Sequence, residues 1–162
     1  MGEIFAKLPD GKEAKIAIKE MKIAIVQSRY NNSITNELFR GAREGLRDCN
    51  VSEEIFSIDV PGALEIPLAV KRLAESKQKK FDAIIALGCV IRGETSHYDL
   101  ICNEITRALM NISLDYNIPV LHGILTTENI EQAKARSGEK MNNKGYECAL
   151  SAVEFCLSLK SF

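Results

Sequence analysis

One loop of the sequence combines residue types that can bind an anion and move protons. Within residues 82–99, DAIIALGCVIRGETSHYD, a hydrophobic run is followed by a short polar loop and then by a helix-type pattern. Gly93 lets backbone amides approach a ligand closely, and residues 94–96 stand where a helix presents unpaired N–H groups. A phosphate group would be stabilised at such a position.

His97, one of only two histidines in the chain, comes directly after this loop. An imidazole titrates near neutral pH, so His97 could move protons on a molecule held in the anion site. A second interpretation needs no ligand: Ser96 would cap the helix and His97 would be a surface residue. The loop alone leaves both interpretations open. Which of them applies depends on the strands and helices that position the loop.

The hydrophobic pattern predicts four strands that alternate with helices. Strands are expected over residues 21–27, 54–60, 83–87 and 119–125, and Thr127 is expected to cap the short helix after the last of them. This order predicts an α/β three-layer sandwich with a central, mostly parallel, flavodoxin-like sheet. We expect residues 1–162 to form a single domain. Residues 1–20 are a lead-in, in which the run IAI at residues 16–18 is interpreted as a short strand added to a neighbouring subunit.

In such a sheet, ligands bind in the crevice outside the carboxyl ends of the strands. That rule brings together the loops at residues 28–31, 61–65, 89–97 and 122–127. These loops offer different chemical groups. The groups are the aromatic ring of Tyr30, the carboxylate of Glu65, the anion site with His97, and the imidazole of His122.

Several of these residues also have an ordinary structural interpretation. Tyr30 could be a half-buried packing residue, His122 a hydrogen-bonded core histidine, and Arg136 a solvated charge. Glu65 is harder to explain in this way, because it stands in the apolar sequence ALEIPLA. A buried carboxylate there would cost free energy unless a ligand or a helix N-terminus hydrogen-bonded it.

Composition argues against several classes of protein. A net charge of −1 with interspersed acids and bases predicts neither nucleic acid nor an anionic membrane as a partner. The apolar runs are too short to span a bilayer and the N-terminus lacks a signal-peptide pattern, so a cytoplasmic location is expected. Five cysteines without metal-type spacing predict neither a disulfide framework nor a zinc site. Cys89 is expected to line the site rather than to act as a nucleophile.

The chain resembles the lumazine synthase family in four collinear motifs: SRYN, VPGALEIPLA, ALGCVIRGETSHYD, and ILTTENIEQAKARSGEK leading to NKGYECALSAVEF. The resemblance runs from about Met21 to the C-terminus. It implies a transferase of riboflavin biosynthesis that uses no cofactor. The implied reaction condenses 5-amino-6-(D-ribitylamino)uracil with 3,4-dihydroxy-2-butanone 4-phosphate to 6,7-dimethyl-8-ribityllumazine, the penultimate step of the pathway, with release of phosphate and water.

The resemblance also implies roles for individual residues. The residues implied to bind the two substrates are Tyr30, Asn31, Ala63, Leu64, Glu65, Cys89, Val90, Ile91, Glu94, Thr95, His122, Arg136 and Lys144. Tyr30 would stack on the pyrimidine ring, and Glu65 would hold the ribityl hydroxyls. Thr95 would bind the phosphate, which Arg136 would reach from a neighbouring subunit. His97 would be the catalytic general acid and base.

Several positions depart from the usual pattern of the family, among them Met141 and Asn142 in the turn before the NKG segment. Tyr30 and His122 stand where the family commonly has phenylalanine, and Leu64 replaces a more usual aromatic residue. A tyrosine still gives an aromatic platform. The changes at His122 and Leu64 alter the polarity of the pyrimidine edge and one wall of the pocket, without changing a catalytic group.

Assembly and partners follow from the same resemblance. Family members form homo-pentamers with active sites between subunits, and the compact turn at residues 138–145 resembles members that build a 60-subunit shell. Riboflavin synthase is the implied functional partner. Three alternatives remain: a non-catalytic flavodoxin-like binding or signalling protein, a shell protein that has lost activity, and the archaeal type of riboflavin synthase. The RGETSH loop favours lumazine synthase over the last of these.

Overall fold

The computed structural model describes residues 12–52 and 54–160, which fold around one parallel sheet. The sheet contains β1 (Ile23–Ser28), β2 (Phe56–Val60), β3 (Ala83–Ile91) and β4 (Val120–Thr127). The strands lie in the order β2-β1-β3-β4, and every pair is parallel. This confirms the predicted α/β sandwich, and the strand order is that of a flavodoxin-like sheet.

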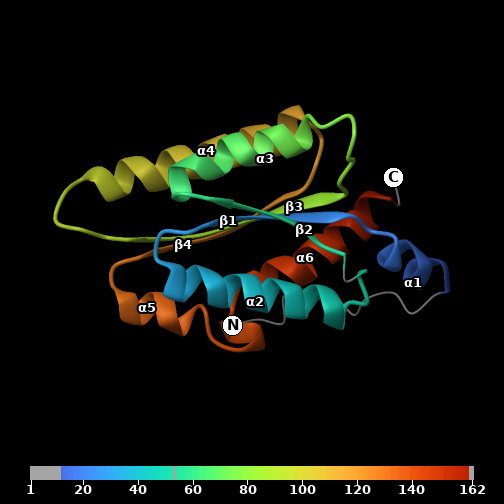
Figure 1. Ribbon diagram of the computed structural model, residues 1–162, viewed down its shortest axis with the longest axis horizontal. Coiled ribbons are helices and arrows are strands. Elements are labelled where there is room, and N and C mark those ends of the chain that lie inside the picture. Colours follow the sequence, from blue (N-terminus) through green and yellow to red (C-terminus); the bar gives the residue numbers. More distant parts are fainter. Residues whose placement is uncertain (1–11, 53, 161–162) are drawn as a thin grey trace.

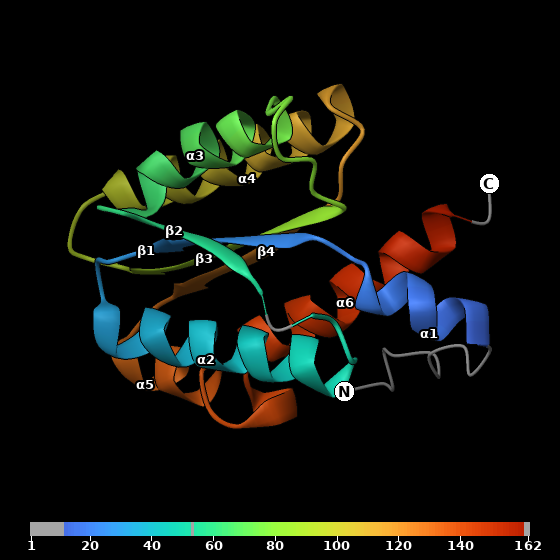
Figure 2. The same cartoon turned by 45° about the vertical axis from the view of Figure 1, so that its right-hand side comes forward.

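Helices cover both faces of the sheet. They are α1 (Lys12–Lys19), α2 (Asn32–Asp48), α3 (Ile66–Ala74), α4 (His97–Asp115), α5 (Ile130–Ala135) and α6 (Lys144–Leu159), with short 3₁₀ turns η1 (Ala63–Glu65) and η2 (Lys140–Asn142). Figures 1 and 2 show α3 and α4 on one face and α2, α5 and α6 on the other. None of the described helices is long and apolar enough to cross a membrane.

The continuous apolar runs of the central strands explain the layers. Successive side chains of a strand point to opposite faces, so Ile25 and Leu87 enter the core under α2 and α6, whereas Val26 and Ile84 enter the core under α3 and α4. All four side chains are fully buried. Burial on both faces is why these strands are apolar throughout rather than alternating, and it requires a helical layer on each side.

The first described element, helix α1, differs from the sequence-based prediction. The run at residues 16–18 lies in helix α1, so the strand predicted there is wrong, whereas residues 1–11 of the lead-in lie outside the described residues. Lysine, glutamate and alanine favour a helix, which places Ile18 in the core beside α6 and leaves Ile16 50% exposed. A helix satisfies its own backbone hydrogen bonds, whereas a strand needs a partner edge.

The end of β3 and the start of α5 also differ from the sequence-based prediction. β3 continues to Ile91 instead of ending at Leu87, because its last residues pair in register with β4 up to Thr127. Thr127 is therefore a strand residue and not a helix cap. Asn129 caps α5 instead, since its side chain accepts a hydrogen bond from the backbone N of Gln132.

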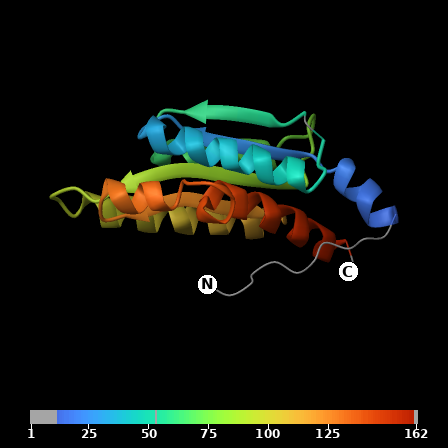
Figure 3. The same cartoon turned by 90° about the horizontal axis from the view of Figure 1, so that it is seen from below.

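Helices α2 and α6 lie side by side beneath the sheet (Figure 3) and approach each other closely. Asn143 caps α6 by accepting hydrogen bonds from two backbone amides, and its side chain also donates to the carbonyl of Glu37 on α2. A Cβ added at Gly145 would lie 1.9 Å from the carbonyl oxygen of Leu38, a backbone atom that cannot move freely. The absence of a side chain at Gly145 therefore allows this contact.

We expect Gly145→Ala to destabilise the protein by about 3 kcal/mol, because the new methyl group overlaps the backbone of α2. Urea denaturation followed by circular dichroism at one fixed protein concentration measures the change. Gly138→Ala is the matched control, since its Cβ would meet only ordinary contacts at 3.5 Å. Equal unfolding midpoints for the two variants would contradict this account of the α2–α6 contact.

Candidate functional site

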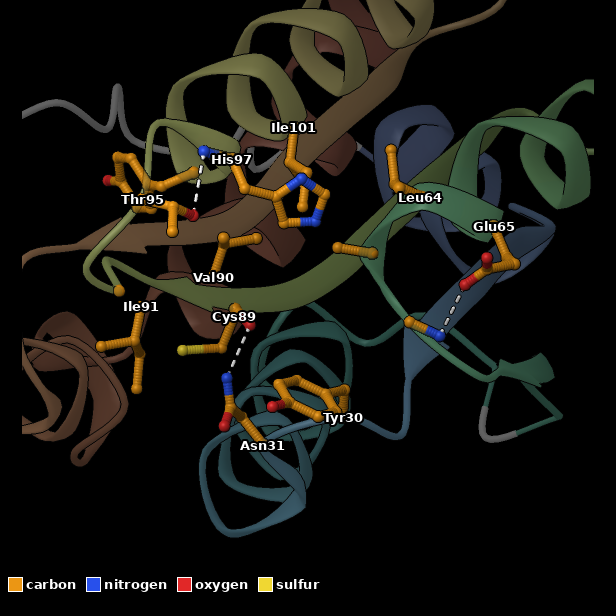
Figure 4. A pocket seen from close by; sticks show the side chains of 14 residues that line it. Tyr30, Asn31, Leu64, Glu65, Cys89, Val90, Ile91, Thr95, His97 and Ile101 are labelled. Carbon is orange, nitrogen blue, oxygen red and sulfur yellow. Dashed lines mark hydrogen bonds between the residues drawn. The ribbon is translucent and has the colours of Figure 1, made fainter.

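The carboxyl ends of β1 and β3, the turn η1 and the start of α4 enclose a cavity of about 360 Å³ (Figure 4). Its lining consists of Tyr30, Asn31, Gly62, Ala63, Leu64, Glu65, Cys89, Val90, Ile91, Gly93, Thr95, His97, Tyr98 and Ile101. All of them except Tyr98 and Ile101 come from three of the four loops that the sequence analysis brought together. The predicted crevice at the strand ends is therefore present within one chain.

Most of the predicted site residues line this cavity, but four do not. Glu94, His122, Arg136 and Lys144 lie outside its lining. The sequence reasoning missed the side chains of Tyr98 and Ile101, although Ile101 lies four residues after His97 on α4. That spacing places two side chains on one face of a helix and could have revealed the second residue.

His97 is the first residue of α4, and its imidazole points into the cavity between Val90 and Ile101 (Figure 4). Ser96 occupies the N-cap position, but its side chain makes no capping hydrogen bond. Instead, the hydroxyl oxygen of Thr95 accepts a weak hydrogen bond of 3.4 Å from the backbone N of His97. The side-chain cap expected of Ser96 in the second interpretation is therefore not formed, whereas His97 is an exposed residue that also lines the cavity.

The loop after β1 presents an exposed aromatic ring. Tyr30 is 71% exposed, which excludes the half-buried packing role considered for it, and its ring stands at the edge of the cavity (Figure 4). Asn31 follows in the left-handed conformation, with φ of 58°. Its side-chain amide donates a 2.9 Å hydrogen bond to the carbonyl of Cys89, which ties this loop to the end of β3.

Glu65 is exposed rather than buried, so the expected burial penalty does not arise. One carboxylate oxygen accepts a 2.8 Å hydrogen bond from the backbone N of Gly62 and thereby holds the turn η1 (Figure 4). The carboxylate has further lone pairs that can accept hydrogen bonds from a ligand. Glu65 therefore combines a local structural contact with an open acceptor in the cavity.

Cys89 lies within β3 and is 2% exposed. Burial raises the pKa of its thiol to about 11, so the thiolate is scarce near neutral pH. Its carbonyl is already paired with Asn31. Val90 and Ile91, which complete the strand, are partly exposed and offer apolar surface to the cavity.

His122 does not lie at a strand end, although the sequence analysis grouped it with the strand-end loops. It lies inside β4 opposite Ala86, and its Nε2 is 3.1 Å from the hydroxyl oxygen of Thr106 on α4. Burial lowers the pKa of His122 below its ordinary value. In this chain it is thus a partly buried, hydrogen-bonded histidine beside α4.

Two of the predicted phosphate ligands lie beside α5 and α6 instead. Arg136 follows α5 and Lys144 begins α6. Both pair with the carboxylate of Glu147, at 2.9 Å from the arginine and 3.2 Å from the lysine. The solvated-charge interpretation of Arg136 is therefore wrong, and neither cation lines the cavity of its own chain.

The cavity offers contacts suited to a planar ring and to an anion. Tyr30 offers an aromatic face, Glu65 an acceptor, and Thr95 a hydroxyl beside the start of α4. His97 stands where it can exchange protons with a molecule bound between them. Within residues 12–52 and 54–160, no cluster of histidine, cysteine and acidic side chains could hold a metal ion.

A known protein family matches most of the chain. The model of the family described as 6,7-dimethyl-8-ribityllumazine synthase matches residues 20–160. The matched region contains every strand, every cavity-lining residue, and the distant His122, Arg136 and Lys144. Because the match covers far more than half of the chain, this protein belongs to the 6,7-dimethyl-8-ribityllumazine synthase family of riboflavin biosynthesis.

Proposed function

We propose that this chain catalyses the condensation of 5-amino-6-(D-ribitylamino)uracil with 3,4-dihydroxy-2-butanone 4-phosphate to 6,7-dimethyl-8-ribityllumazine. One observation carries the proposal: His97, Tyr30 and Glu65 face one cavity in a chain of this family. A binding module would not require a titratable imidazole next to both an aromatic platform and an anion site. That combination favours an enzyme over the non-catalytic alternatives.

Each substrate has a place in the cavity. The pyrimidine ring stacks on Tyr30, and the ribityl hydroxyls donate to the open carboxylate oxygen of Glu65. The phosphate lies at the start of α4, where the hydroxyl of Thr95, backbone amides and the helix dipole stabilise negative charge. Cys89, Val90 and Ile91 form the wall between these two regions.

His97 supplies the proton transfers that the condensation needs. The free amine of the pyrimidine attacks the ketone, and water leaves to form an imine. Elimination then breaks the carbon–oxygen bond to phosphate. Tautomerisation and attack of the ribitylamino nitrogen on the second carbonyl close the ring with loss of a second water. An imidazole can accept and return a proton in several of these steps, while holding the two substrates together lowers the barrier further.

The cavity of one chain lacks a cation free to bind the phosphate, at least among the described residues. Arg92, which begins the loop that carries Thr95 and His97, is already paired with Asp99 and Glu128. We therefore assign Arg136 and Lys144 of a neighbouring copy to the phosphate, and His122 of that copy to the pyrimidine edge. Such sites require a closed homo-oligomer, for which the family suggests a pentamer with a 60-subunit shell as its larger form.

Exposed apolar side chains on the α3–α4 layer support this assembly. Leu68 on α3 and Leu100, Met110 and Leu114 on α4 are each more than half exposed, at 65%, 63%, 58% and 71%. These helices pack side by side on one face of the sheet (Figure 1). Large exposed apolar side chains gathered on one layer are typical of an interface. Riboflavin synthase, which consumes the lumazine, is the proposed functional partner.

The first prediction concerns His97. We expect the wild-type protein to form the lumazine from both substrates, and His97→Ala to lower turnover by about 10 to 1,000-fold, because binding and proximity remain while proton transfer is lost. Lumazine absorbance in steady-state assays measures both rates. Arg40→Gln, which removes an exposed arginine on α2, is the control and should retain wild-type turnover. Wild-type turnover by His97→Ala would overturn the catalytic assignment.

The second prediction concerns Cys89. Because the pKa of its thiol is about 11, fewer than about one thiol in 1,000 is ionised at pH 7.5. We expect iodoacetamide to label Cys89 far more slowly in the folded protein than in urea, and Cys89→Ala to remain active. Mass spectrometry of the peptide that contains Cys89 follows the labelling. Labelling at the unfolded rate, or loss of turnover in the variant, would point to a nucleophilic role.

The third prediction concerns assembly. We expect light scattering to give a particle of about 90 kDa or a multiple of it, five times the chain's 18.0 kDa. Leu114→Glu should shift the mass towards that of a single chain, because it places a charge in the proposed interface. Lys15→Gln on α1, which changes the net charge by the same −1 at an exposed position, is the control. A monomeric wild-type protein would rule out shared active sites.

A further inference from the structure

Arg92 is the first residue after β3 and begins the loop that carries Thr95 and His97. Its backbone N donates a 2.8 Å hydrogen bond to the carbonyl of Thr127, which extends the pairing with β4 by one position. The backbone of Arg92 is therefore held by the sheet. Its side chain contacts residues on α4 and one residue in the segment after β4.

The guanidinium group of the half-buried Arg92 contacts three other side chains. Its two terminal nitrogens donate to the two carboxylate oxygens of Asp99 at 2.9 and 2.8 Å. Its Nε lies 2.8 Å from a carboxylate oxygen of Glu128, in the segment after β4. The guanidinium also lies over the ring of Tyr98, 4.1 Å from the centroid. Paired and stacked contacts of this kind require the planar fork of arginine.

These contacts join the two ends of the segment at residues 93–96. Arg92 stands before the segment and Asp99 stands in the first turn of α4 behind it. Apart from short-range hydrogen bonds to the first turn of α4, the segment has little other support, because residues 93–96 are exposed, nothing lies within 4 Å of a Cβ placed on Gly93, and Ser96 provides no side-chain cap. The ion pair with Asp99 therefore closes a loop that would otherwise be weakly restrained.

The charge balance shows that Arg92 itself is poorly suited to bind substrate. One guanidinium faces the carboxylates of both Asp99 and Glu128, so its positive charge is already compensated. The same contact lowers the pKa of Asp99, because the hydrogen bonds from the guanidinium group stabilise the charged carboxylate. Arg92 is also absent from the cavity lining, whereas its stacking partner Tyr98 belongs to it.

We propose that Arg92 is a positioning residue whose contacts with Asp99, Glu128 and Tyr98 hold the loop so that Thr95 and His97 face the cavity. This inference rests on the proposed function for its kinetic consequences. Exposed ion pairs add little to global stability. The effect of Arg92 is therefore on loop geometry, where a displacement of about 1 Å can cost about 100-fold in rate.

Two substitutions of Arg92 test the proposal kinetically. Arg92→Lys keeps the charge but loses the fork, and Arg92→Gln removes both. We expect kcat/KM for the butanone phosphate to fall by about 10-fold in the first variant and about 100-fold in the second. KM for the ribitylaminouracil should stay within about twofold, since Tyr30 and Glu65 lie on other loops. Arg40→Gln, which breaks the exposed Arg40–Glu37 pair on α2, is the matched control.

Asp99→Asn keeps the arginine in place and tests the pairing itself. If Arg92 acts through Asp99, the double variant Arg92→Gln/Asp99→Asn should be little worse than Arg92→Gln alone. Additive losses would overturn the proposed coupling. A rise in KM for the ribitylaminouracil of about tenfold or more would do the same, because Tyr30 and Glu65 lie on other loops and such a rise would indicate a general structural defect rather than a displaced loop.

Hydrogen exchange gives a readout that does not depend on the reaction. We expect the peptide covering residues 93–100 to exchange about tenfold faster in Arg92→Gln than in the wild type, while peptides from α2 stay unchanged. Unchanged exchange at residues 93–100 would overturn the positioning role even if turnover falls. A wild-type protein without turnover would instead overturn the proposed function, and faster exchange in the variant would still support the loop assignment.

Discussion

The structure depends above all on the burial of β1 and β3 on both faces. Their side chains point alternately into two separate cores, so each face of the sheet must carry helices. Parallel strands with helical crossovers have all their carboxyl ends at one edge. The cavity at that edge is thus a consequence of the buried strands. Parallel pairing brings three segments to the same edge: the last residues of β3 with Cys89, the loop after β1 with Tyr30, and the turn η1 after β2.

The electrostatics of the site divide into two parts. On the cavity side, the positive charge of Arg92 is compensated by the carboxylates of Asp99 and Glu128. On the opposite layer, Arg136 and Lys144 both form ion pairs with the carboxylate of Glu147. The proposed function brings these two regions together between copies of the chain. The exposed apolar side chains of the α3–α4 layer support such an assembly.

The hydrophobic pattern of the sequence predicted an element correctly where burial determines that element. It was less reliable where hydrogen-bond partners from other parts of the chain determine it. The four strands were predicted because continuous apolar runs between polar turns are typical of buried parallel strands. The end of β3 was missed because pairing with β4 extends it through Ile91. The strand at residues 16–18 was wrong because the alternation of isoleucine also fits a helix that buries Ile18 alone. Glu65 was misjudged because exposure depends on the turn η1 and not on its apolar neighbours.

By itself, the sequence determined the fold class, the family and most of the cavity lining, because apolar periodicity and collinear motifs are properties of the chain alone. The tertiary structure decided which chemical groups meet. It turned His97 into the cavity, placed His122 beside Thr106 away from it, and paired Arg136 with Glu147. It also closed the RGETSH loop through Arg92 and Asp99. The physical reason is that these contacts join residues that are far apart along the chain or on opposite sides of a turn. The distance between two such side chains is fixed only when the helical layers pack on the sheet.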